Sequence, residues 1–166
     1  MTNYAILEHS ALFEGLSLKE IDNLLVSMKA YQKTYQEHET LIHESTAVDD
    51  LGIILSGAAQ SYKVNFLGHK IIISEHLPGG YTALLTALSQ RRTCPMSIQA
   101  LEKIEVLFIP YESLFKYYPE QERAHQLFLK NLFDSAAERA LELHDRNDCL
   151  IMPSIRDKVM MHLKIV

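Results

Sequence analysis

Histidine and cysteine are the residues of this sequence that most readily support metal or redox chemistry, and their spacing argues against such a site. Eight histidines occur, but no two lie four residues apart on one predicted helix, as a helical zinc site requires. Two cysteines, Cys94 and Cys149, form neither a CxxC metal motif nor a four-cysteine iron–sulfur site. We therefore expect surface histidines, reduced structural thiols, no metal and no cofactor.

Catalytic motifs are missing from the sequence as well. It contains no Gly-x-Ser-x-Gly nucleophile motif, no Walker phosphate loop and no His-Glu-x-x-His motif. Asp49 and Asp50 are adjacent, which is more typical of a solvated turn than of a general acid–base pair. We therefore expect a binding protein rather than an enzyme, with no catalytic residue.

The charge of the chain argues against broad electrostatic binding of nucleic acid. Its 16 Lys and Arg residues are outnumbered by 21 Asp and Glu residues, which gives a net charge of −5. The exception is the range Ser154 to Val166, which contains Arg156, Lys158 and Lys164 and a single acidic residue. Excess positive charge is thus concentrated at this end of the sequence.

Composition and length indicate one globular domain outside the membrane. The 166 residues are 48% hydrophobic and 22% charged, which is ordinary for a folded protein. Apolar runs such as Leu51 to Leu55 are far shorter than the ~20 residues that a membrane-spanning helix needs, and Met1 to Ala5 lacks the features of a signal peptide. We expect a cytoplasmic protein without membrane contacts.

The order of the predicted elements favours an α+β fold. Ser17 and Glu20 form a capping box before a helix that runs to Met28. Short segments rich in β-branched and aromatic residues follow and are predicted to be strands, as in a sandwich or barrel: Tyr31 to Tyr35, Thr40 to Ile42, Leu51 to Leu55, Ala58 to Val64, Lys70 to His76, Met96 to Ala100 and Glu105 to Ile109.

A long helix is predicted after these strands. A short helix from Tyr111 to Tyr118 ends at Pro119, and neither Gly nor Pro interrupts the range from Glu120 to Asn147. A helix of that length extends about 40 Å, which is longer than so small a domain covers. Its coiled-coil spacing predicts a homodimer interface, although the stripe also fits packing on its own β domain: Leu129, Leu132, Ala136, Ala140 and Leu143.

The last residues predict the start of another domain. Cys149 to Pro153 reads as an apolar hinge, and Ser154 caps a helix from Ile155 to at least Leu163. The apolar face of that helix has no downstream partner in the sequence: Val159, Met160, Leu163 and Val166. We therefore expect it to be the first helix of a domain absent from this chain.

Several segments together resemble the Crp/Fnr superfamily of bacterial transcription regulators. The matching segments are Leu12 to Ser17 with Glu20-Ile21, Leu51 to Gly57, Ile98 to Ile109, and Ser154 to Leu163. The resemblance implies a cyclic-nucleotide-binding-type β-roll (a jelly-roll-like double-stranded β-helix) with short N-terminal helices and a long C-terminal dimerisation helix. It also implies a sensor domain over 1–118, the dimerisation helix over 119–148, and the start of a DNA-binding winged-helix domain over 154–166.

The departures from the family pattern bear on the ligand. Members that bind cyclic nucleotides carry a Gly-Glu pair for the ribose and an Arg-Ser or Arg-Thr pair for the phosphate. By alignment these positions hold Ala83-Leu84 and Thr93-Cys94 here, so neither ionic partner is present. Ser45 likewise replaces a turn glycine, so that turn must avoid or tolerate a positive φ.

The sequence thus predicts the sensing and dimerisation part of a Crp/Fnr-type regulator with an unknown small-molecule effector. It would bind DNA only through a downstream helix-turn-helix domain. The pocket is predicted to suit an amphipathic or aromatic anion rather than a cyclic nucleotide, and its residues are Tyr81, Thr82, Leu84, Leu85, Leu88, Arg91, Arg92, Thr93 and Cys94. Two alternatives stay open: a cyclic AMP or cyclic GMP sensor that uses Arg91 or Arg92, and a ligand-free truncated interaction protein.

Overall fold

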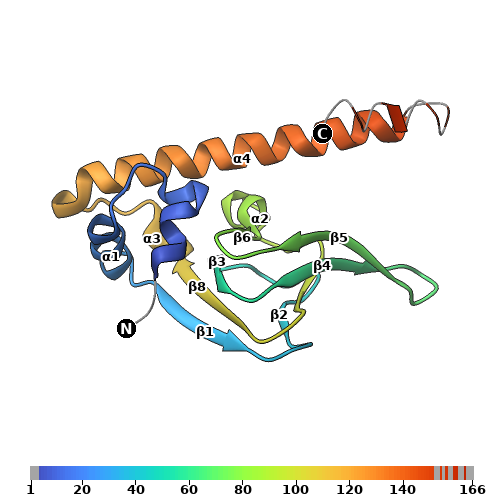
Figure 1. The fold of residues 1–166 in the computed structure, drawn as a ribbon, viewed down its shortest axis with the longest axis horizontal. Helices are drawn as coiled ribbons and strands as arrows, with labels where there is room; N and C mark the ends of the chain where they lie inside the picture. The colour runs from blue at the N-terminus through green and yellow to red at the C-terminus, as the bar shows by residue number, and fades with distance from the viewer. Residues whose placement is uncertain (1–3, 152–153, 155, 157–158, 161–162, 164–166) are drawn as a thin grey trace.

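The computed structural model describes residues 4–151, 154, 156, 159–160 and 163, which form a β-roll with short helices on one side and one long helix along it (Figure 1). Two 3-10 turns, Tyr4–His9 and Ala11–Phe13, precede α1 (Leu18–Ser27). The predicted capping box is confirmed. Ser17 Oγ accepts a hydrogen bond from the backbone N–H of Glu20, and the Glu20 carboxylate accepts one from the backbone N–H of Ser17.

The strands of the described residues form two antiparallel sheets, with orders β1-β8-β3-β6 and β2-β7-β4-β5. Each predicted strand is present within one or two residues of its predicted ends, so the expected α+β roll is confirmed. The strands are β1 (Tyr31–Tyr35), β2 (Thr40–Ile42), β3 (Asp50–Ser56), β4 (Ala59–Val64), β5 (Lys70–His76), β6 (Tyr81–Thr82), β7 (Ser97–Ala100) and β8 (Ile104–Pro110).

The two central strands of the first sheet, β3 and β8, are buried on both faces, and their successive side chains point in opposite directions. One set packs against the N-terminal helices and the long helix: Leu51, Ile53, Leu55, Leu107 and Ile109. The other set packs between the two sheets: Ile54, Ile104, Val106 and Phe108. The sheet is therefore the shared wall of two apolar cores.

Two short elements in the pocket segment were not predicted from the sequence. β6 pairs with β3 opposite Gly52, where any Cβ would collide with the Thr82 side chain. The helix α2 (Leu84–Leu88) follows immediately, and its N-cap Ala83 has a left-handed backbone with φ 55°. The glycine at position 52 thus allows the close strand approach that places α2.

A short helix after β8 ends earlier than predicted. α3 spans Tyr111–Leu114 rather than continuing to Tyr118. Tyr118 precedes Pro119 and has φ −123° and ψ 86°, because proline disfavours the helical conformation in the residue before it. Pro119 then opens a 3-10 turn, Pro119–Gln121, that leads into the long helix.

The long helix α4 spans Glu122–Ile151 and, among the described residues, no helix is long and apolar enough to cross a bilayer. The predicted hinge from Cys149 to Pro153 is wrong for residues 149–151, because neither Gly nor Pro ends the helix there. Residues 152–153 lie outside the described residues. Of the predicted helix 155–163, the described residues 156, 159, 160 and 163 are helical.

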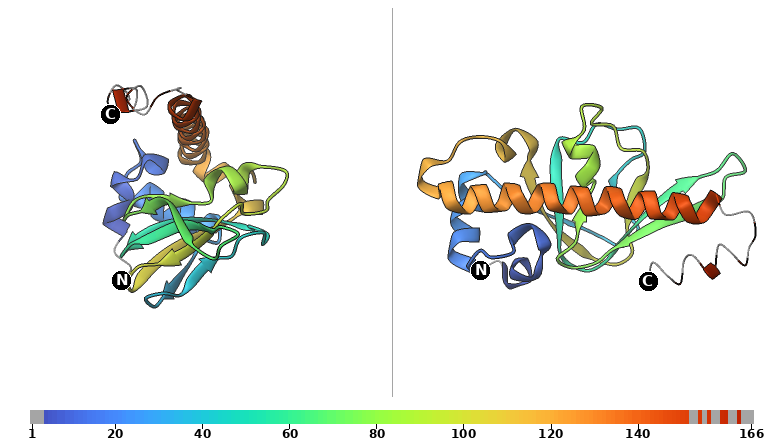
Figure 2. Two further views of the ribbon diagram at one scale, coloured as in Figure 1. Left: turned by 90° about the vertical axis from the view of Figure 1, so that its right-hand side faces the viewer. Right: turned by 90° about the horizontal axis from the view of Figure 1, so that it is seen from above.

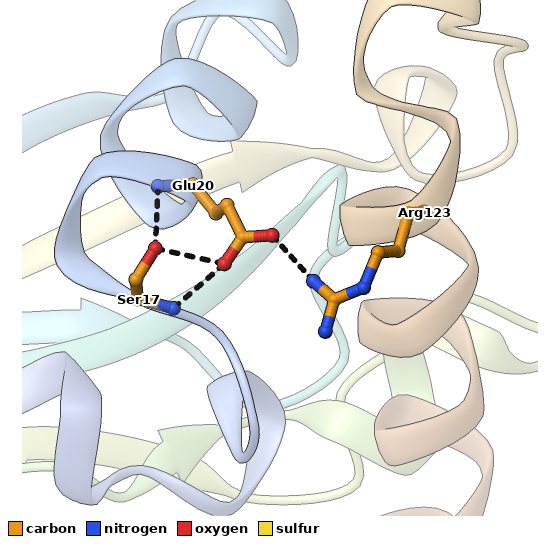
Figure 3. A network of polar contacts seen from close by, with 3 residues as sticks. All are labelled: Ser17, Glu20 and Arg123. Carbon is orange, nitrogen blue, oxygen red and sulfur yellow. Dashed lines mark hydrogen bonds and ion pairs between the residues drawn. The ribbon is translucent and has the colours of Figure 1, made fainter.

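A polar network joins the start of α4 to the N-terminal helices (Figure 3). The Glu20 carboxylate that completes the capping box also accepts a hydrogen bond from the Arg123 guanidinium. Further along α4, the Asn131 side chain donates to the backbone carbonyls of Leu12 and Glu14, at 3.3 Å and 2.9 Å. These contacts attach the first half of α4 to the N-terminal segment.

The predicted seam residues share one stripe of α4, but the structure buries them to different extents. Leu132 is fully buried in the chain's own core, with Phe128 beside it, and Leu129 and Ala136 pack partly against that core. The interpretation that the stripe packs on its own domain therefore holds for this half of the helix. The outward face, which the ribbon leaves uncovered (Figure 2), carries exposed apolar residues that include the predicted Ala140: Phe133, Ala137, Ala140 and Leu141.

Candidate functional site

A cavity of about 180 Å³ lies where the β-roll meets α4. Figure 1 shows α2 between the strands and α4, and this short helix forms part of the cavity wall. Both sheets, α2, the segment before β7 and α4 contribute to the lining: Ser61, Ile73, Ser74, His76, Tyr81, Ala83, Leu84, Leu85, Thr86, Cys94, Pro95, Met96, Ile98, Arg139 and Leu143. A molecule bound there would touch the roll and the long helix together.

One side of this cavity carries a hydrogen-bonded polar group. The Nε2 of His76 lies 2.5 Å from Ser61 Oγ, and its Nδ1 lies 3.2 Å from the Tyr81 carbonyl oxygen. Because a carbonyl oxygen only accepts, Nδ1 carries the proton in the neutral ring and Ser61 donates to Nε2. Burial lowers the pKa of His76, and the Arg139 charge lowers it further. The ring is therefore neutral at pH 7.

Arg139 is the only permanently charged side chain among the described residues that line this cavity. It reaches the cavity from α4 and is 26% exposed, and its Nη1 donates to Glu142 Oε2 at 2.6 Å. Arg139, His76 and Tyr81 also line a second, more open pocket that contains Glu75 and Glu142. The polar group thus lies at the junction between an apolar interior and the solvent.

The backbone around α2 agrees with the alignment used in the sequence analysis. That alignment predicts that the charged residues which bind ribose and phosphate in the family pattern are missing from this chain. Ala83, which stands where the family pattern has glycine, is in the left-handed region with φ 55°. Ser45, which replaces a second glycine, has φ 64°, so that turn tolerates the positive φ. Leu84 stands at the acidic position and lines the cavity. No carboxylate from α2 therefore reaches this site.

The structure brings four of the nine predicted pocket residues into the cavity lining: Tyr81, Leu84, Leu85 and Cys94. Thr82 is buried beside Gly52 of β3, and Leu88 packs against the core of the N-terminal helices and α4. Arg91 and Thr93 are exposed, and the Thr93 hydroxyl donates to the Arg91 carbonyl oxygen at 2.9 Å. Arg91 and Thr93 therefore lie outside the cavity lining, which the chain rejoins at Cys94.

Arg92 also lies outside the lining. Its guanidinium stacks 3.5 Å from the centre of the Tyr111 ring, and its Nη1 is 4.0 Å from Asp49 Oδ1. A guanidinium held between an aromatic ring and a carboxylate already has favourable partners. Arg92 therefore contributes to the packing of the α2–β7 segment against α3, and not to the cavity.

Cys94 is a buried thiol of the cavity wall. Burial raises its pKa, and the neighbouring Glu44 charge raises it further. Neither Arg91 nor Arg92 is among the groups that shift this pKa. The thiol is therefore protonated at neutral pH, in agreement with the expected structural role of Cys94.

Sequence reasoning missed the two most polar residues of the cavity, His76 and Arg139. His76 ends β5, and Arg139 lies among other charged residues of α4, where helical charges usually face solvent. Only the crossing of α4 over the roll brings them together. Among the described residues, no three His, Cys, Asp or Glu side chains cluster as a metal site would require.

A family model for the cyclic nucleotide-binding domain matches residues 32–120 of the chain. These residues contain all of β1 except Tyr31, together with β2 to β8, α2 and α3, and therefore most of the cavity wall. No curated protein matches the sequence significantly.

Solved structures with the same fold include bacterial regulators. The catabolite activator protein of Thermus thermophilus has a TM-score of 0.71 and 23% identity, over 85% of this chain and 63% of that one, so this chain spans less than two thirds of its length. The sensor domain of the Pseudomonas aeruginosa regulator DNR has a TM-score of 0.66 and 16% identity, over 92% and 94%. The N-terminal domain of a Streptomyces coelicolor regulator has a TM-score of 0.65 and 18% identity, over 84% and 92%. The expected resemblance in fold is confirmed.

Proposed function

Because the chain belongs to the cyclic nucleotide-binding domain family, we propose that it is the effector-sensing and dimerisation part of a Crp/Fnr-type transcriptional regulator. The observation that carries this proposal is that the roll and α4 both line one cavity. A ligand that contacts both elements favours one arrangement of α4 over another, which is the differential binding that a sensor requires. The function is regulatory and involves no catalytic residue.

The effector in this proposal is not a cyclic nucleotide. At the positions aligned with the family's charged anchors, a ribose hydroxyl and a phosphate would meet Leu84 and Thr93 instead of an acid and an arginine, and each unpaired polar group is costly to bury. The cavity of about 180 Å³ is also below the roughly 300 to 1,000 Å³ that ligand pockets commonly have. Titration calorimetry with cyclic AMP and cyclic GMP at about 1 mM should detect no binding.

Dimerisation in this proposal uses the outward face of α4. Phe133 and Leu141 are each 57% exposed, and the small Ala137 and Ala140 between them let a second helix approach closely. Of the seam residues predicted from the sequence, Ala140 belongs to this face, whereas Leu132 is a core residue and Leu143 lines the cavity. The proposed partner is a second copy of the chain, which would bury this stripe.

We further propose the domain division expected from the sequence. Residues 1–118 sense the effector, 119–148 form the dimerisation helix, and 154–166 begin a DNA-binding domain. In this division the helix-turn-helix follows the sensor, so the 166-residue chain alone should show no operator-specific gel shift at physiological salt.

Sedimentation velocity tests the proposed dimer. The wild-type chain should sediment as a dimer at tens of micromolar, and Phe133→Glu should yield a monomer, because a buried unpaired carboxylate opposes association. Val26→Glu is the matched control, since Val26 is 72% exposed on α1 and lies outside the proposed face. A monomeric wild-type chain would contradict the dimerisation role.

A further inference from the structure

The cavity walls select for a compact apolar group. Most of the lining side chains are aliphatic or sulfur-containing, among them Ile73, Leu84, Leu85 and Met96. An apolar cavity of about 150 Å³ holds benzene and stays free of water. The cavity of about 180 Å³ therefore has room for one six-membered ring or a short branched chain, and not for a purine with its sugar.

The position of Arg139 adds a charge requirement. A ligand whose apolar part fills the cavity would direct its polar end toward the junction with the second pocket, where Arg139 is found. A guanidinium matches a carboxylate through two parallel hydrogen bonds and is fully charged at any physiological pH. No Asp or Glu is among the described lining residues of the inner cavity, so the carboxylate that a bound anion must displace from Arg139 is that of Glu142.

The guanidinium has donors available for such a ligand. Only its Nη1 is hydrogen-bonded within the described residues, to the carboxylate of Glu142, whereas an Arg side chain carries five N–H donors. Glu142 is 57% exposed at its side chain, so water can solvate it when a ligand takes its place. Glu142 and Glu75 in the outer pocket also disfavour a second negative charge on the ligand.

From these observations we infer that the cavity binds a compact monocarboxylate with an apolar body, and that Arg139 of α4 holds its carboxylate. This inference rests on the proposed sensing function and names its effector class. Because Arg139 belongs to α4 and the apolar walls belong mainly to the roll, the two ends of one ligand would join the two parts of the sensor.

The test is titration calorimetry of the full chain with benzoate, hexanoate and the neutral isostere benzamide. Benzoate or hexanoate should bind, and benzamide should bind about tenfold or more weakly than benzoate, because it lacks the charge that strengthens a hydrogen bond to Arg. Arg139→Gln should reduce benzoate affinity to that of benzamide and leave benzamide affinity unchanged. Arg139→Lys, which keeps the charge without the planar fork, should give an intermediate affinity.

Arg146→Gln is the matched control, since Arg146 is exposed on the same helix and does not line the cavity. Equal affinity for benzoate and benzamide, unchanged benzoate affinity in Arg139→Gln, or no carboxylate binding at about 10 mM would each overturn the inference. Cyclic AMP binding that Arg139→Gln leaves unchanged would overturn the effector class while leaving the sensing role. A monomeric chain that binds benzoate through Arg139 would instead contradict only the dimerisation role.

Discussion

Adjacent residues Leu132 and Phe133 of α4 provide a test that separates the two roles of the helix. Leu132 is 0% exposed and packs in the chain's own core, whereas Phe133 is 57% exposed on the outward face. Replacing each with alanine removes a large apolar side chain from one face only. Leu132→Ala should therefore lower the stability of the single chain, whereas Phe133→Ala should weaken the association of two chains.

The expected magnitudes follow from burial. Removing a fully buried leucine costs about 2 to 5 kcal/mol, because apolar contacts are lost and a cavity remains. For a chain of this size each kcal/mol lowers Tm by roughly 2 to 4 °C, so Leu132→Ala should lower Tm by about 4 to 20 °C. A surface change such as Phe133→Ala should alter monomer stability by no more than about 0.5 kcal/mol.

Urea unfolding at low and high protein concentration measures both effects. The Leu132→Ala loss should be nearly independent of protein concentration, since it acts within one chain. The Phe133→Ala loss should grow with concentration, because association stabilises the folded state by mass action. A concentration-independent loss of 2 kcal/mol or more in Phe133→Ala, with little loss in Leu132→Ala, would refute the assignment of the two faces.

Three further predictions concern the cavity and the N-terminal helix. Glu142→Gln should raise benzoate affinity severalfold in calorimetry, because Arg139 then has no competing carboxylate; unchanged or lower affinity would contradict that competition. Benzoate affinity should stay nearly constant from about pH 8 to 6.5, because burial lowers the pKa of His76 and the ring stays neutral, and should rise only at lower pH, where protonation of His76 adds a positive charge beside the bound anion; a rise that begins above pH 7 would count against the assignment. Ser17→Ala should lower Tm by about 2 to 4 °C in a thermal melt through loss of the N-cap, and an unchanged Tm would show that the capping box does not stabilise the fold.

Much of the β-roll could be predicted because its signals are local. Period-two alternation and turn residues give the strands, and Ser17 with Glu20 gives the helix start. β6 and α2 were missed because two and five residues are too few to show a period. The left-handed Ala83 that joins them is also unusual for a residue with a Cβ.

The two faces of α4 illustrate a second limit. Leu132 and Phe133 are adjacent and both apolar. Each lies three or four residues from other apolar residues of the helix, so each fits the spacing of an apolar stripe. The sequence pattern shows that apolar stripes exist, but not which one the roll covers. Packing of the Phe128 and Leu132 side chains into the core settles the orientation.

Sequence patterns also predict only those features of the candidate site that lie within one continuous segment. The departures at Leu84 and Thr93 could be read from the sequence, because they depend on alignment with a family pattern. Arg139 could not, since it lies more than 40 residues from the pocket segment in a helix rich in surface charge. Its role depends on tertiary structure alone.

The central claim, that one cavity joins the roll to α4 through a small anion, is tested most directly by a crystal structure of the chain grown with benzoate. The account predicts the ring among Leu84, Leu85 and Met96, with the carboxylate within hydrogen-bond distance of the Arg139 guanidinium. Benzoate bound elsewhere on the protein, with the cavity filled only by water or by neighbouring side chains, would contradict it.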